Sequence, residues 1–203
     1  MRTDFDPQNP TPSFYRLLTA VVVPRPIAWV SSVSAAGVDN LAPHSFFTVS
    51  CVNPPIVQFT SVGRKDSLRN VEASGEFVVN LAPEGLFEQV NATGTNFPPD
   101  VSEFDAVGLT REPGARVKAP RVAQSPVALE CVLHATLCLG DSTVVFGRVV
   151  LAAVHDDVLV DGHPDVGLLK PLSRLGRNEW GDPPTARAID RISYADWPGH
   201  YRG

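Results

Sequence analysis

One stretch of strict alternation constrains the fold more than any other feature of the chain. Every second position of residues 127–139 is apolar, namely Val127, Leu129, Cys131, Leu133, Ala135, Leu137 and Leu139. Glu130, His134 and Thr136 lie between them. Successive side chains of a strand point to opposite faces, so this period predicts a long strand with one buried face. The turn residues 140–142 follow, and residues 143–154 are predicted to return as a second, antiparallel strand.

Shorter apolar runs predict the rest of a sheet. Strands are expected at residues 27–33, 56–61, 76–81 and 158–160, and helices at 13–18, after residue 66, and at 83–90. Residues 94–114 are rich in turn formers and have no clear period. Closing such a sheet into a barrel would remove its edges. The 203 residues therefore predict one mainly β barrel domain with a few short helices.

Composition excludes several classes of function. The formal charge of −5 leaves no basic footprint for nucleic acid. No apolar stretch is long enough to cross a bilayer, and the amino terminus lacks the apolar core of a signal peptide. A cytoplasmic protein with neither a membrane nor a nucleic-acid partner is expected.

Cysteine and histidine spacing predicts no metal site. The three cysteines have no CxxC spacing, and Cys131 and Cys138 point to opposite faces of one strand. All three are expected to be reduced and mostly buried. His163 lies beside two aspartates, a pattern more typical of a solvated turn than of a metal site. His134 and His155 are expected to be a cross-strand hydrogen-bonding residue and a turn residue.

The clearest binding signal is a cationic cluster where a strand gives way to a helix, at Gly63-Arg64-Lys65-Asp66-Ser67. The first N–H groups of a helix lack intrahelical partners and carry the positive end of its dipole, so they attract an anion. Arg64 can fork onto a phosphate, Lys65 adds a mobile charge and Ser67 can donate, with Asp66 as the expected N-cap. An ordinary capped surface helix with two solvated bases is the alternative.

Other cofactor motifs are absent from the sequence. It contains no Walker loop, GxGxxG fingerprint, HExxH or nucleophile elbow. Nicotinamide binding in the Rossmann manner is therefore not expected.

Several motifs together resemble the flavin reductase-like family of FMN-binding split-barrel proteins. They are PRPIAWVSS at 24–32, NLAPHSFF at 40–47, NPP at 53–55, KDSLRN at 65–70, GDSTVVFGRV at 140–149 and PLSRLG at 171–176. The last segment resembles the family's flavoredoxin-like branch. The resemblance implies an antiparallel split β-barrel over residues 13–180, flanked by an N-terminal arm (1–12) and a C-terminal extension (181–203). The aromatic tail, with Tyr194, Trp197, His200 and Tyr201, is expected to pack on the barrel or on a partner subunit.

The resemblance also implies noncovalent FMN, or FAD, at a homodimer interface. It would place Ser31 and Ser32 near the isoalloxazine and ribityl chain. The motif that contains Asn40, Ala42, Pro43, His44, Ser45 and Phe46 would bond the flavin. Arg64, Lys65 and Ser67 would hold the phosphate, with Asn70 supporting that turn and Arg174 as a further contact. His44, Arg177 and Trp180 depart from the residues usual in the family.

Three functions follow from this resemblance. The first hypothesis is an NAD(P)H-dependent flavin reductase, in which hydride moves from nicotinamide C4 to flavin N5, serving a partner monooxygenase in one version. The second is a flavoredoxin-like electron carrier that retains its FMN, and the third is a flavin-binding barrel without turnover. The cofactor supplies the electronics, so no side chain is predicted to act as a catalytic acid or base.

Overall fold

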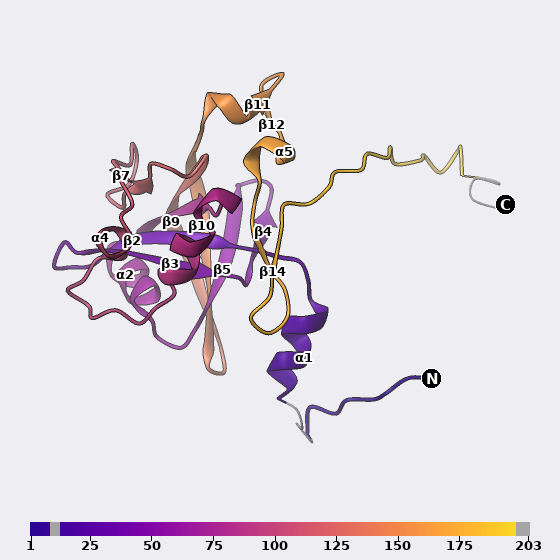
Figure 1. Cartoon of the computed structure of the whole chain (residues 1–203), viewed down its shortest axis with the longest axis horizontal. Coiled ribbons are helices and arrows are strands. Elements are labelled where there is room, and N and C mark those ends of the chain that lie inside the picture. Colours follow the sequence, from indigo (N-terminus) through magenta and orange to yellow (C-terminus); the bar gives the residue numbers. More distant parts are fainter. Residues whose placement is uncertain (9–12, 198–203) are drawn as a thin grey trace.

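A seven-stranded antiparallel sheet organises the chain in the computed structural model, which describes residues 1–8 and 13–197 (Figure 1). Its strands are β2 (Ala28–Val33), β3 (Asp39–His44), β4 (Phe47–Cys51), β5 (Ile56–Val62), β6 (Glu76–Leu81), β9 (Val127–Leu139) and β10 (Ser142–Val154). They are ordered β3-β2-β6-β9-β10-β5-β4. The predicted mainly β class is confirmed.

Smaller elements surround the sheet. Short ladders join β1 (Arg25–Pro26), β13 (Ser173–Arg174) and β14 (Trp180–Gly181), then β7 (Arg111–Glu112) with β8 (Arg121–Val122), and β11 (Leu159–Val160) with β12 (His163–Pro164). The helices are α1 (Phe14–Val21), α2 (Asp66–Ser74), α3 (Phe87–Ala92), α4 (Glu103–Ala106) and α5 (Val166–Leu169), with 3₁₀ turns η1 (Glu84–Leu86) and η2 (Asp156–Val158). Most expected elements are thus present, although the helix expected at 83–90 is split and η2 takes the start of the strand expected at 158.

Closure of the sheet into a barrel is not confirmed. Strands β3 and β4 occupy the two edges, and no ladder joins one to the other within residues 1–8 and 13–197. The backbone N–H of Thr60 does donate to the carbonyl of Phe46, in the link between these strands, at 2.9 Å. The two edges therefore approach the same corner without pairing.

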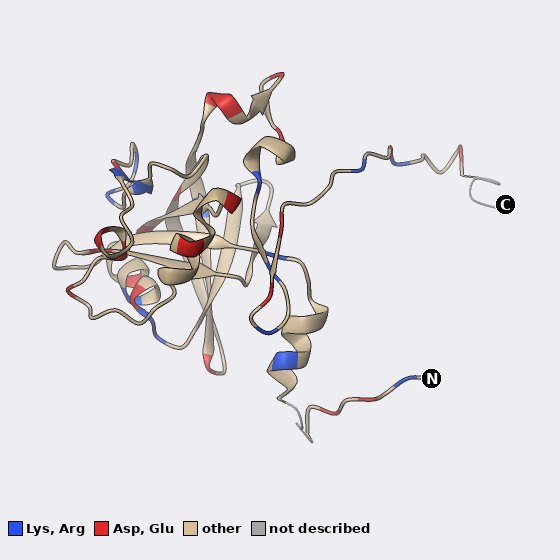
Figure 2. Cartoon of the chain, viewed as in Figure 1, with Lys and Arg blue, Asp and Glu red and all other residues tan. Residues whose placement is uncertain are grey.

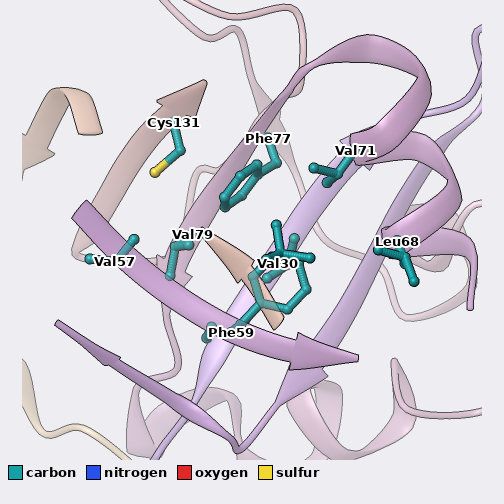
Figure 3. Close-up of a cluster of buried hydrophobic side chains, with 10 residues drawn as sticks. Val30, Val57, Phe59, Leu68, Val71, Phe77, Val79 and Cys131 are labelled. Atoms are coloured by element: carbon teal, nitrogen blue, oxygen red, sulfur yellow. The ribbon is translucent and has the colours of Figure 1, made fainter. Parts of the chain in front are cut away.

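One hydrophobic cluster fixes helix α2 against the sheet. Leu68 and Val71 on the helix are fully buried and pack with Phe59 and Phe77 from β5 and β6 (Figure 3). Side chains at i and i+3 lie on one helix face, which explains how so short a helix presents both to the core. This packing sets where the first turn of α2 points.

A second cluster packs on the opposite side, around Trp29 and Phe104, which are both fully buried. The indole N–H of Trp29 donates to Thr93 Oγ1 at 2.9 Å. Thr93 is itself buried and begins the loop that follows α3. The buried tryptophan thereby ties this loop to the sheet.

The long hairpin departs from the predicted single buried face. Glu130, expected on the exposed face of β9, is fully buried because the segment that includes Arg121 covers it. Beyond Val132, β9 has a ladder only with β10, because Glu76, the first residue of β6, is aligned with Val132. Leu137 and Leu139 are consequently 50% and 55% exposed. The alternation correctly predicted a strand, but the prediction of which of its residues are buried was wrong.

Three smaller findings concern the predicted cysteines, tail and membrane contact. All three cysteines are free, but only Cys131 is buried, so the expectation that most are buried was wrong. Tyr194 is 92% exposed and does not pack on this chain's sheet, while His200 and Tyr201, like residues 9–12 of the N-terminal arm, lie outside the described residues. No helix in the described part of the chain is both long and apolar enough to span a bilayer.

Candidate functional site

A cleft of about 290 Å³ lies where the end of β3, the start of α2 and the loop after α3 meet. Eight residues that sequence reasoning assigned to a cofactor line it: Asn40, Ala42, Pro43, His44, Ser45, Phe46, Lys65 and Ser67. Residues that were not predicted complete the lining: Tyr15, Thr60, Val62, Asp66, Thr93, Gly94, Thr95, Asn96, Phe97 and Glu103. The structure therefore brings together two motifs that are well separated in sequence.

The start of α2 presents unpaired backbone donors to this cleft. Lys65, not the predicted Asp66, is the N-cap, and its backbone is extended with no side-chain cap bond. Within the described residues, the N–H groups of Asp66, Ser67 and Leu68 have no protein acceptor. Asp66 turns its carboxylate to Arg69 instead of capping. Because no side chain satisfies the first turn, it remains available to an anion.

Of the two predicted cations, only Lys65 lines the cleft. Arg64 pairs with Glu72 at 2.7 Å and leaves 66% of its side chain exposed. In Figure 2 the Lys and Arg positions along the ribbon are interspersed with Asp and Glu positions. The role of Arg64 as a phosphate contact stays a prediction.

A buried polar network connects β3, α2 and α4 at the floor of the cleft. The Asn40 amide donates from Nδ2 to Glu103 Oε1 at 2.8 Å, and its Oδ1 accepts from Ser67 Oγ at 3.0 Å. Glu103 Oε2 also accepts from the backbone N–H of Leu41 at 2.8 Å. Burial raises the pKa of Glu103, although these donors oppose the shift. The single Ser67 proton is thus used within the protein, which leaves its oxygen as an acceptor.

His44 places an unsatisfied nitrogen at the same cleft. The side chain is 7% exposed, its ring lies 4.6 Å from that of Phe59, and Nε2 is buried without a hydrogen-bond partner. Burial lowers the pKa of His44 to about 4, against a smaller raising effect from the backbone of Thr60. The imidazole is therefore neutral at pH 7, and a ligand group could satisfy Nε2.

Three predicted contacts lie behind the cleft lining. Ser31 donates to the Pro120 carbonyl and accepts from Asn80 Nδ2 at 3.2 Å. Ser32 accepts from Asn70 Nδ2 at 3.2 Å. All three side chains are buried, and in this structure they join β2 to neighbouring segments. Their direct contact with a flavin stays a prediction.

Arg174 borders a second cavity of about 220 Å³, which is lined by Ile27, Pro43, Ser45, Asn91, Gly94, Arg174 and Trp180. Pro43, Ser45 and Gly94 also line the first cleft, so the two cavities adjoin. The Arg174 guanidinium lies over the Trp180 indole, 4.6 Å from its ring centroid. This cation is separate from the start of α2.

Sequence reasoning missed Glu103 and the loop after α3. Both belong to a stretch without hydrophobic period, where a carboxylate gives no sign of its burial. Ser102 directly before the glutamate is the N-cap of α4, which is the one local signal present. Only the tertiary contact with Asn40 shows that the glutamate belongs to the site.

Comparison with known proteins identifies the family. The model of the flavin reductase like domain matches residues 20–167, which include both β3 and α2. The chain belongs to this family. A protein of Aquifex aeolicus is 42% identical to the flavin reductase-like chain over 171 residues, covering 81% of this chain and 87% of that protein.

Solved structures agree with this family and with the fold. Nitrilotriacetate monooxygenase component B from Bacillus cereus is 32% identical, with a TM-score of 0.89 over 93% of this chain and 99% of that one. The 2-nitrobenzoate 2-nitroreductase NbaA of Pseudomonas fluorescens is 28% identical, with a TM-score of 0.87 over 95% and 98% of the two chains. Membership in the flavin reductase-like family, predicted from the motifs, is confirmed.

Proposed function

We propose that the cleft binds FMN and that the protein is an NAD(P)H-dependent flavin reductase. The observation that carries the proposal is the first turn of α2, which has three unpaired N–H groups and contributes Asp66 and Ser67, beside Lys65, to the lining of the cleft. A terminal phosphate fits this turn by both hydrogen bonding and charge. FAD, which contains the same riboflavin phosphate, is the alternative flavin for this site.

The other lining groups suit the rest of a flavin. The Asn40 amide is held by Glu103 and Ser67, so its position is fixed before a ligand arrives. His44 Nε2 is buried and unpaired in a ring that is neutral at pH 7, so it can form a hydrogen bond with a polar group of the ligand. Phe46 and Tyr15 provide aromatic surface for a planar ring, with ring centroids 6.5 Å apart.

The lining residues suit binding and orientation of a flavin, and the flavin supplies the redox chemistry. When bound, the flavin supplies a two-electron acceptor for hydride from NADH or NADPH. Lys65 and the first turn of α2 hold the phosphate, and the Glu103-Asn40 pair keeps β3 in register with that helix. Aromatic lining excludes water from one side. No lining residue needs to move a proton, which agrees with the absence of a predicted catalytic acid or base.

Two features support proposals about partners. The likeness to a monooxygenase component B supports delivery of reduced flavin to a separate monooxygenase.

Exposed apolar residues at the outer hairpin and sheet edge support a homodimer that completes the flavin site: Val49, Val62, Leu137 and Leu139 are 69%, 44%, 50% and 55% exposed. A second copy would cover the open edges β3 or β4, as the expected split-barrel assembly requires. Sedimentation of wild type and Leu137→Glu tests this assembly.

The deciding experiment is an FMN titration of Lys65→Ala by quenching of flavin fluorescence. Loss of a charge-assisted contact should weaken FMN binding by about 1–3 kcal/mol, or roughly fivefold to 150-fold. Arg64→Ala should have a smaller effect because Arg64 must first leave Glu72. Lys118→Ala, an exposed lysine outside the cleft lining, is the matched control. Unchanged affinity in Lys65→Ala would contradict the site.

Nicotinamide oxidation then separates the three functions. A reductase oxidises NADH or NADPH rapidly when free FMN is added and releases the flavin. An electron carrier keeps its FMN through gel filtration and oxidises nicotinamide slowly. A protein that binds FMN and oxidises neither nicotinamide would be the non-catalytic barrel and would overturn the reductase proposal.

A further inference from the structure

The second cavity combines apolar walls with a cation that has no acidic partner. Ile27, Pro43 and the Trp180 indole supply the apolar surface, while Ser45 and Asn91 supply polar groups. None of its lining residues is acidic. Arg174 makes no ion pair with any carboxylate in the described part of the chain, and its one hydrogen bond runs from Nη2 to the Arg177 carbonyl at 3.0 Å. The remaining guanidinium donors are free for a ligand.

A second guanidinium increases the positive potential at this place. Arg25 lies directly opposite Arg174 in the β1–β13 ladder, an arrangement that destabilises a sheet because like charges face each other. Arg25 is 7% exposed and donates to the carbonyls of Thr19, Val22 and Leu175. Burial lowers the pKa of Arg25, and the charge of Arg174 lowers it further. Within residues 1–8 and 13–197 neither guanidinium is paired with a carboxylate, so an anion bound to Arg174 would reduce its repulsion with Arg25.

Arg174 is held in one orientation, and it therefore suits a flat carboxylate better than a mobile cationic side chain would. The guanidinium is stacked on Trp180, and that indole is in turn held edge to face against Phe87, with ring centroids 5.2 Å apart. A planar fork held in one orientation matches the two oxygens of a carboxylate. The stack therefore orients the donors before a ligand arrives.

The size of the cavity restricts the ligand. Its volume of about 220 Å³ is smaller than the first cleft of about 290 Å³, to which the flavin is assigned, so a ligand smaller than FMN is expected here. One ring that carries one anionic group is within its limits. Because the cavity shares Pro43, Ser45 and Gly94 with the first cleft, a ligand here would lie beside whatever occupies that cleft.

We propose that this cavity is a binding subsite for a small aromatic carboxylate, with Arg174 bonded to the carboxylate and the apolar walls in contact with the ring. Its position next to a flavin rests on the proposed function. The anion site itself rests only on Arg174, Arg25 and the cavity.

Benzoate is the probe, titrated calorimetrically into the full-length protein with and without saturating FMN. Benzyl alcohol tests the need for the charge, and acetate tests the need for the ring. We expect benzoate to bind at least about tenfold more tightly than either, since a bidentate charged contact and ring burial both contribute. Equal binding of benzyl alcohol would overturn the anion site, and equal binding of acetate would overturn the aromatic one.

Variants of Arg174 locate the binding. Arg174→Gln should weaken benzoate at least about tenfold, and Arg174→Lys by less, because lysine keeps the charge but loses the fork. Arg116→Gln, an exposed arginine outside both cavities, should match the wild type. Unchanged benzoate affinity in Arg174→Gln would reject the proposal. FMN affinity is measured separately, so Arg174-dependent benzoate binding by a protein that does not bind FMN would leave the subsite standing and reject the proposed function.

Discussion

Replacing Glu130 by glutamine is expected to destabilise the protein strongly while leaving its shape almost unchanged. The carboxylate is fully buried and accepts four N–H groups. Ala115 N–H and the Nε and Nη2 of Arg121 reach Oε1 at 2.8, 2.8 and 2.5 Å, and Arg116 N–H reaches Oε2 at 2.6 Å. Burial alone would raise the pKa of Glu130, but these donors and the Arg121 charge lower it overall.

The magnitude follows from which oxygen the glutamine amide replaces. Glutamine loses least by keeping its oxygen at the Oε1 position, which places its NH₂ against the Arg116 N–H. One buried donor is then unpaired, at a cost of about 1–3 kcal/mol, and Arg121 loses its buried counter-ion. Removing one partner of a buried ion pair costs roughly 3–5 kcal/mol, and we expect Glu130→Gln to fall in that range.

The matched control is Glu112→Gln, because Glu112 bonds the same Arg121 at 2.6 Å but leaves 42% of its side chain exposed. An exposed pair contributes only about 0–1 kcal/mol. Urea unfolding of both variants at pH 7, followed by far-UV circular dichroism, gives the two free energies of unfolding. Losses of similar size, both under about 1 kcal/mol, would refute the argument that burial and the number of donors determine the cost.

Two further predictions concern His44 and Gly147. Burial lowers the pKa of His44 from 6.5 in the unfolded chain to about 4 in the folded protein. The neutral ring therefore stabilises the fold fully above pH 6.5, and this stabilisation is lost as the pH falls from 6.5 to 4. His44→Phe should therefore lose about 3 kcal/mol less stability than the wild type between pH 7 and pH 4, as measured by urea unfolding, and identical losses would contradict the buried neutral ring. A Cβ at Gly147 would lie 2.3 Å from the Phe77 ring, so Gly147→Ala should cost about 1–3 kcal/mol, whereas Gly140→Asn, at a turn with positive φ and open space, should cost less.

Strand identity could be predicted from the sequence because it depends on local period. The alternation in β9 and the short apolar run of β5 both give strands at the predicted residues. Burial could not be predicted in the same way, because it depends on what covers the strand. Glu130 is buried by a segment that itself has no regular period, and Leu137 is exposed because β6 stops short of it.

The candidate site also has a part that the sequence predicts and a part that it does not. The β3 and α2 motifs were found because each is contiguous in sequence, and the structure places Asn40 and Lys65 at one cleft. Pairings between distant side chains were not foreseen. Glu103 accepts a hydrogen bond from Asn40, Glu72 forms an ion pair with Arg64, and the Pro120 carbonyl accepts a hydrogen bond from Ser31. The local spacing of residues in the sequence predicts none of these contacts.

The order of strands in the sheet has a consequence for how the protein is made. Strand β5, which leads into α2, is flanked by β4 and by β10, and Ile56 is aligned with Arg148. A ribosome therefore produces the Lys65 corner long before its second neighbour exists, and that pairing waits for closure of a large loop. A cofactor that needs both neighbours of β5 can bind only after β10 has been made, so we expect it to stabilise the folded sheet more than the residues that emerge first.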